Sequence, residues 1–174
     1  MRAHRSLAFN RSTVFSNGFF WKDRKRELEI ILGRNGMTAR HSTHVPPGFS
    51  AVTPYLTVDD PDMLVSFVAA GFGAEELTDQ RALGSDGKTT HTAFRVEGCI
   101  IETGRASNQS KTFPASLHIY VPDADATYAQ AIKAGGASLH DVRDMKYGER
   151  SGAVQDPCGN HWYIATFKGL PTET

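Results

Sequence analysis

Cysteine and long apolar runs are both scarce in this sequence of 174 residues. The two cysteines, Cys99 and Cys158, do not form the spaced sets that are typical of disulfide frameworks or zinc sites. We therefore expect both to be reduced thiols in a cytoplasmic protein. No apolar stretch approaches the roughly 18 residues that a membrane-spanning helix needs, so we expect no membrane partner.

The chain also lacks a net charge, because 19 Lys and Arg residues balance 19 Asp and Glu residues. This balance conceals an asymmetry between the two parts of the chain. Residues 1–50 contain 9 basic and 3 acidic residues, which leaves 10 basic and 16 acidic residues for 51–174. An acidic segment binds the phosphate backbone poorly, so we expect no nucleic-acid partner.

Residues 1–50 form a basic extension that a Pro-Pro-Gly sequence separates from the rest of the chain. Three interpretations stay open for it: a disordered tail, an upstream stretch ahead of a true start at Met37, and a targeting segment. The composition, with 40% hydrophobic residues, predicts a globular domain, which we place at 51–168. Residues 169–174 would then be a C-terminal tail.

The domain contains an internal repeat with an offset of 63 residues. Val58-Asp-Asp-Pro-Asp62 in the first copy overlays Val121-Pro-Asp-Ala-Asp125 in the second, and a helix-length run follows each. An Asp at this point caps the free N–H groups of a helix and favours the positive end of its dipole. We expect glycines to end the helices, with Gly71 and Gly73 ending the first.

A short strand precedes each predicted helix, and three strand candidates follow it. The three lie at about 74–80, 88–96 and 98–104 in the first copy, and at about 137–143, 150–156 and 160–167 in the second. The sequence therefore predicts an α+β fold of two tandem βαβββ modules, at about 51–104 and 115–167. We expect the modules to curl into a half-barrel around a central cleft, with the helices outside.

At this level of detail the sequence resembles the vicinal oxygen chelate superfamily, which includes glyoxalase I, bleomycin-resistance proteins and extradiol dioxygenases. The paired strand–Asp–helix–Gly units carry the resemblance, together with the closing stretch Asp156-Pro-Cys-Gly-Asn-His-Trp-Tyr163. Three further stretches are similar to the glyoxalase-like PhnB-type branch: Leu117–Tyr128, Tyr147–Arg150 and Trp162–Thr166. The resemblance covers residues 51–167 and implies a glyoxalase-like fold.

The resemblance also implies where a metal ion would bind. In metal-using members, each half supplies one ligand from its first strand and one from its last. By register these four positions map onto Thr53, Glu102, Ser116 and Tyr163. Only Glu102 is a good ligand for a catalytic divalent ion, so we expect a degenerate metal site and no cofactor.

The polar residues near these positions form the predicted site. If the protein is an enzyme, which the sequence leaves uncertain, His118 and Glu102 are the catalytic candidates. The other residues that we expect to line the ligand pocket are Tyr55, His91, Ser116, Tyr120, His161 and Tyr163. Each also has a structural interpretation: His118, for example, would be a packing histidine, and Glu102 an exposed carboxylate at a strand end.

Three hypotheses for the function follow. The first is a metal-free small-molecule pocket of the glyoxalase or bleomycin-resistance kind, with or without turnover. The second is a lyase or dioxygenase that holds a single divalent ion (Zn, Ni, Mn or Fe) with a shifted ligand set of Glu102, His118 and His91. The third is a non-catalytic module whose pocket is vestigial. Unpaired sheet edges and the resemblance both imply a homodimer.

Overall fold

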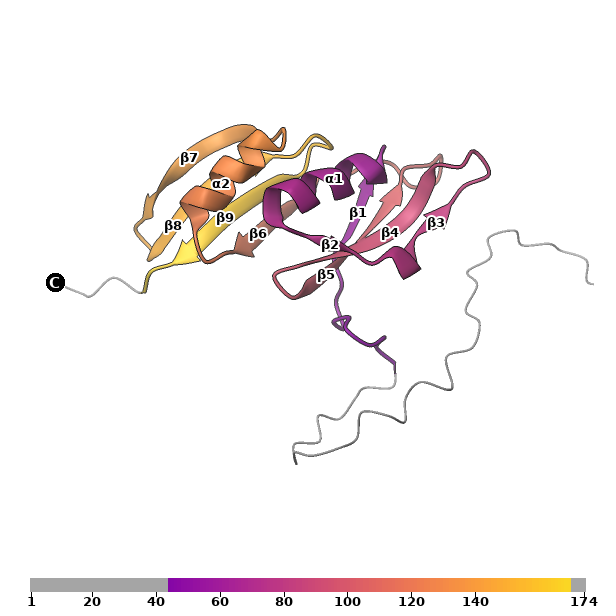
Figure 1. Cartoon of the computed structure of the whole chain (residues 1–174), viewed down its shortest axis with the longest axis horizontal. Helices are drawn as coiled ribbons and strands as arrows, with labels where there is room; N and C mark the ends of the chain where they lie inside the picture. The colour runs from indigo at the N-terminus through magenta and orange to yellow at the C-terminus, as the bar shows by residue number, and fades with distance from the viewer. Residues whose placement is uncertain (1–43, 170–174) are drawn as a thin grey trace, which may run out of the picture. The chain divides into compact units, whose positions relative to one another are not determined.

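The first module contains one long helix and a small mixed sheet (Figure 1). Its elements are β1 (Tyr55–Val58), α1 (Pro61–Phe72), β2 (Glu75–Glu76), the 3-10 helix η1 (Thr78–Gln80), β3 (Ala82–Leu83), β4 (Thr89–Val96) and β5 (Cys99–Arg105). The strand order is β1-β5-β4-β2, and β3 also pairs with β4. Because β1 and β5 run parallel, the first and last strands of the module lie side by side.

The second module repeats this plan. Its elements are β6 (Ser116–Tyr120), α2 (Ala124–Lys133), β7 (Ala137–Met145), β8 (Glu149–Gln155) and β9 (His161–Phe167). The strand order is β6-β9-β8-β7, and β6 runs parallel to β9. The predicted α+β fold of two βαβββ modules is therefore confirmed, as two separate mixed sheets.

This computed structural model describes residues 44–169. The predictions for residues 1–43 and 170–174, including the start at Met37, lie outside the described residues. Among the residues that are described, no helix has the length and apolar character needed to cross a membrane.

Both helices begin as the sequence predicts. The Asp60 carboxylate accepts hydrogen bonds from the backbone N–H groups of residues 62 and 63, and the Asp123 carboxylate accepts one from the N–H of residue 126. Each carboxylate thereby satisfies donors that have no partner inside the helix. Gly73 caps α1 in the left-handed conformation, with φ of 66°.

Two predictions of detail were wrong. The expected strand at 74–80 is only the two residues of β2, followed by η1. Gly71 does not end α1 but lies inside it, where a Cβ atom would come within 3.3 Å of the Ala131 Cα atom in α2. The missing side chain lets α1 and α2 pack closely, and the Gln130 side chain adds a hydrogen bond to the Ala70 carbonyl of α1.

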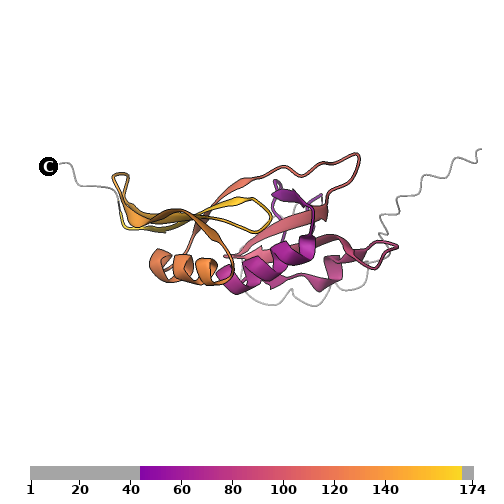
Figure 2. The ribbon, with the colours of Figure 1, turned by 90° about the horizontal axis from the view of Figure 1, so that it is seen from above.

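The core lies between the helices and one face of each sheet. Figure 2 shows both helices on the same side of the strands. Leu64, Phe67 and Val68 of α1 are buried in the same cluster as Phe94 of the first sheet and Trp162 of the second. Side chains alternate along a strand, so the neighbouring positions of each sheet project from the other side. We call that surface the helix-free face.

Candidate functional site

The predicted site residues lie on the helix-free faces of the two sheets. In the first sheet, β-register pairs Tyr55 with Glu102 across β1 and β5. In the second, it pairs Ser116 with His161 and His118 with Tyr163 across β6 and β9. Residues paired in this way share a face, so each sheet carries its own polar and aromatic cluster.

The first cluster contains Tyr55, His91 and Glu102. The His91 Nε2 atom lies 3.5 Å from Glu102 Oε1, and the Tyr55 and His91 ring centroids are 5.9 Å apart. His91 Nδ1 lies 3.2 Å from the Gln80 carbonyl oxygen. A carbonyl only accepts hydrogen bonds, so Nδ1 carries a proton, and in a neutral ring the Nε2 lone pair faces the carboxylate. A lone pair and a carboxylate that face each other across this distance would attract a cation.

Tyr55 fits into this cluster because Gly104 of β5 has no side chain. A Cβ atom at Gly104 would lie 2.1 Å from the Tyr55 hydroxyl oxygen, so the glycine leaves room for the phenol. Partial burial, together with the negative charge of Glu102, raises the pKa of Tyr55. Tyr55 therefore stays a neutral phenol, and its ring remains 53% exposed.

The second cluster contains His118, Tyr120, Tyr163 and Glu149. The Tyr120 hydroxyl donates a hydrogen bond of 2.6 Å to Glu149 Oε1, which raises the pKa of Tyr120. His118 Nε2 lies 3.5 Å from Glu149 Oε2. The His118 ring stacks on Tyr120 with centroids 4.8 Å apart and lies 6.4 Å from the Tyr163 ring. Two tyrosine rings therefore lie close to one imidazole and one carboxylate.

Glu149 is the site residue that the sequence analysis missed. Its side chain is only 8% exposed, although it lies on β8 within the Tyr147–Arg150 stretch that served only to mark the resemblance. The available signal was the strand pattern: the small residues Ser151 and Ala153 follow Glu149 at alternate positions and leave space beside it. No sequence pattern shows that β6 places two ring side chains over that space.

The two remaining predicted pocket residues, Ser116 and His161, lie outside both clusters. Ser116 is exposed at the start of β6, opposite His161. His161 Nε2 lies 3.5 Å from the side-chain nitrogen of Gln155. Both belong to the helix-free face of the second sheet, at the end of β9 away from Glu149. Their roles stay predictions.

The residues of the shifted metal set do not meet within the chain. His91 and Glu102 are neighbours, but His118 lies beside Glu149 on the other sheet. Across residues 44–169, no group of three or more His, Cys, Asp or Glu side chains is placed to hold an ion. Each sheet of one chain thus offers a single His–Glu pair as possible metal ligands. Two ligands are too few to fit the superfamily's metal ion on their own.

Two hollows on the surface lie away from both clusters. One, of about 460 Å³, is lined by residues that include Asp59, Ser107 and Lys111. The other, of about 410 Å³, includes Phe49 and Cys99. Neither contains a predicted pocket residue. The aromatic rings of the clusters are instead open to solvent, with Tyr120 being 55% exposed.

The closing motif at Asp156 has a structural role. One Asp156 carboxylate oxygen accepts hydrogen bonds from the backbone N–H groups of Cys158 and Asn160. The other accepts from the Asn160 amide and from the Trp162 indole N–H, each at 2.9 Å. Asn160 in turn accepts a hydrogen bond from the Ala115 backbone. This buried network locks the turn before β9 and so sets the register of Tyr163.

An uncharacterised protein of Mycobacterium bovis is 33% identical over 125 residues, which cover 66% of this chain and 81% of that protein. TioX from Micromonospora sp. ML1 has a similar fold, with a TM-score of 0.58 at 22% identity over 68% of this chain and 98% of TioX.

A glyoxalase/bleomycin resistance protein/dioxygenase family enzyme from Burkholderia phytofirmans PsJN also shares the fold. Its TM-score is 0.56 at 17% identity, over 65% of this chain and 94% of that one. Residues 48–164 match the family described as the Glyoxalase/Bleomycin resistance protein/Dioxygenase superfamily. The chain therefore belongs to the glyoxalase/bleomycin resistance protein/dioxygenase superfamily.

Proposed function

We propose that this protein binds a small aromatic or amphipathic molecule between the helix-free face of a first sheet and the helix-free face of a second sheet. One observation carries the proposal: each face gathers tyrosine, histidine and glutamate side chains, and the rings are exposed. Exposed aromatic clusters on a folded domain mark an interaction surface. A few polar groups among apolar walls are typical of small-molecule sites.

The proposal includes a homodimer. In one chain the clusters are open, and the two hollows lie elsewhere. In such a dimer, the first sheet of one chain would cover the second sheet of the other. Tyr55 and Glu102 of the first sheet would then face His118 and Tyr120 of the second sheet across an enclosed space. This arrangement would also shield the apolar rings from water, which favours association.

Two experiments test the proposal. Light scattering should give the mass of a dimer, and a thermal-shift screen with aromatic compounds should find ligands that raise the melting temperature by mass action. Tyr55→Ala and Tyr120→Ala should both weaken binding. Met63→Ala on α1, which removes an exposed side chain from the opposite side of the sheet, is the matched control. A monomer with no ligand response would refute the pocket.

A metal-dependent lyase or dioxygenase is the second candidate, and the His91–Glu102 pair favours it. The Gln80 carbonyl orients His91 with its Nε2 lone pair toward Glu102, as outer-shell partners do at metal sites. Elemental analysis of the purified protein should then find a stoichiometric divalent metal that Glu102→Ala removes. A metal-free protein that still binds aromatic ligands would refute this candidate.

Two finer assignments belong to the same proposal. The Leu117–Tyr128 and Trp162–Thr166 stretches support the PhnB-type branch. A Bacillus cereus protein described as a PhnB protein has a TM-score of 0.54 at 16% identity, which concerns the fold alone. A cytoplasmic location is supported by the two free thiols, Cys99 and Cys158.

A further inference from the structure

Glu149 is a buried carboxylate with only one of its oxygen atoms satisfied. Oε1 accepts the hydrogen bond from the Tyr120 hydroxyl, at 2.6 Å. Oε2 is buried and has no hydrogen-bond partner among the described residues. An unpaired carboxylate oxygen removed from water is costly, so such an atom in a folded protein calls for a functional explanation.

The imidazole of His118 lies near this oxygen atom. The Nε2 atom lies 3.5 Å from Oε2, which is at the outer limit of a hydrogen bond. A neutral imidazole carries its proton on one nitrogen and a lone pair on the other. Because Nε2 faces a carboxylate, the proton is favoured on Nε2; a lone pair there would be repelled by the lone pairs of the oxygen atom. Nδ1 then keeps the lone pair.

The first sheet shows the opposite arrangement. There the Gln80 carbonyl holds the proton of His91 on Nδ1. In His118, by contrast, no described residue hydrogen-bonds to Nδ1, and the side chain is 41% exposed. The His118 lone pair is therefore available to a ligand, whereas both nitrogens of His91 face groups of the protein.

We propose that Glu149 fixes the His118 tautomer so that Nδ1 accepts a hydrogen bond from a hydroxyl group on a planar aromatic ligand. Glu149 is a positioning residue in this site, and His118 is the residue that contacts the ligand. The inference rests on the proposed small-molecule pocket and adds the chemical class of its ligand.

The surroundings of His118 select this class. The exposed rings of Tyr120 and Tyr163 both lie near the imidazole, with centroids 4.8 and 6.4 Å from it, and offer surfaces for stacking. The negative charge of Glu149 disfavours a carboxylate or phosphate at the same place. A ring hydroxyl combines a stacking surface with a neutral donor, so it matches both features.

The tautomer is tested on the full chain without any ligand. Nitrogen-15 NMR of the imidazole side chains at about pH 8, where histidines are neutral, should show His118 protonated on Nε2 and His91 protonated on Nδ1. Glu149→Ala should turn His118 into a mixture of tautomers. Glu149→Gln, which keeps the size of the side chain, should weaken the preference as well, because the charge is lost.

Asp62→Asn, which changes a carboxylate in the first turn of α1 outside both clusters, is the matched control and should leave the His118 signals unchanged. His118→Phe identifies those signals by their disappearance. A His118 that is protonated on Nδ1 in the wild type, or that keeps its tautomer in both Glu149 variants, would overturn the inference.

The ligand class is tested at neutral pH with p-cresol, a phenol that stays protonated there, and p-methylanisole, in which a methyl group replaces the hydroxyl proton. The wild type should bind p-cresol about tenfold more tightly, as expected for one added hydrogen bond. In His118→Phe, which keeps the stacked ring, the two affinities should become equal. Equal affinities in the wild type, or an unchanged preference in the variant, would overturn the inference.

The experiments distinguish a failure of the proposed function from a failure of this inference. If the wild type is a monomer that binds no aromatic compound, the proposed function fails, whatever the tautomer of His118. If aromatic ligands bind but show no preference for a hydroxyl group, the pocket stands and this inference alone is overturned.

Discussion

The two halves of the domain repeat one fold but bury their charges differently. In the first sheet the carboxylate of Glu102 is 29% exposed and faces a histidine whose other nitrogen is already bonded. In the second sheet Glu149 is buried and holds a hydroxyl, while its histidine keeps one free nitrogen. Duplication thus preserved the framework, and the halves diverged in how the histidine and the carboxylate are bonded.

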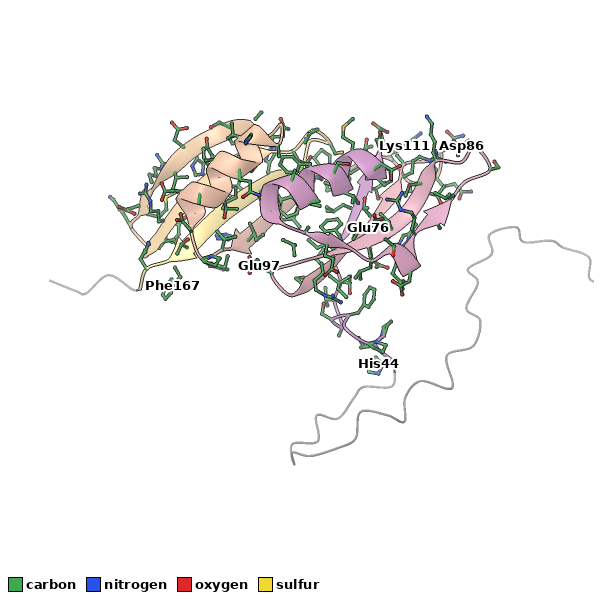
Figure 3. The ribbon with its side chains drawn as sticks, viewed as in Figure 1. His44, Glu76, Asp86, Glu97, Lys111 and Phe167 are labelled. Carbon is green, nitrogen blue, oxygen red and sulfur yellow. The ribbon has the colours of Figure 1, made fainter. Side chains whose placement is uncertain are left out.

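The turns that precede the last strands show the largest contrast. Asp156→Ala should destabilise the domain by more than about 2 kcal/mol, because it leaves the donors of Asn160 and Trp162 buried without partners. The first half uses a tight turn at Glu97 instead, which Figure 3 labels and which has φ of 44°. Glu97→Gly should change stability by less than about 1 kcal/mol. Urea unfolding measures both, and equal losses would contradict the contrast.

Close packing against glycines of the strands should give the next largest difference in stability between variants of the two halves. A Cβ atom at Gly152 would lie 2.7 Å from Val142 Cγ2 and 2.9 Å from Tyr128 Cδ2. Gly152→Ala should therefore cost about 1–3 kcal/mol of stability. Gly104→Ala meets only the movable end of Tyr55, so it should cost less than about 1 kcal/mol but displace the ring. Thermal unfolding tests the first, and reduced ligand affinity at near-wild-type stability tests the second.

The hydroxyl groups of the two tyrosines give a smaller, matched comparison. Tyr120→Phe removes the donor that satisfies Glu149 Oε1, and should therefore destabilise the domain measurably because a carboxylate oxygen loses its partner. The Tyr55 hydroxyl makes no hydrogen bond to a described residue, so Tyr55→Phe should change stability by less than about 0.5 kcal/mol. Chemical denaturation of both variants under the same buffer compares them. Similar losses would mean that Glu149 is not held by Tyr120.

The smallest expected effect concerns acid stability. A hydrogen bond from Arg81 lowers the pKa of Asp62, and one from Arg150 lowers that of Asp125. Both carboxylates therefore stabilise the fold above their unfolded pKa of about 3.9, and this contribution is lost as the pH falls through the lower folded values.

Asp62→Asn should lower stability at pH 7 by less than about 1 kcal/mol, because the pair is half exposed and screened by solvent. The difference from wild type should shrink below about pH 4. Asp125→Asn should have the weaker effect, since Asp62 also accepts a hydrogen bond from the buried Thr89 hydroxyl. Denaturation midpoints between acidic and neutral pH measure both, and a pH-independent loss would exclude the ion pairs as the cause.

The modules, their helix caps and most strand positions followed from local patterns. An Asp before a helix and alternating apolar residues in a strand are readable because neighbours in sequence decide them. Gly71 was misread for the same reason. A glycine near a helix end usually stops the helix, and only the approach of Ala131 from the other module shows that it serves packing.

The sequence alone thus determined the duplication, the α+β modules and a set of polar and aromatic candidates, since these depend on residues close together in the chain. Only the tertiary structure decided which candidates meet. It joined His91 to Glu102 and separated both from His118, which lies beside Glu149 instead. Strand order and register set these pairs, and both arise from packing between segments that lie far apart in the sequence.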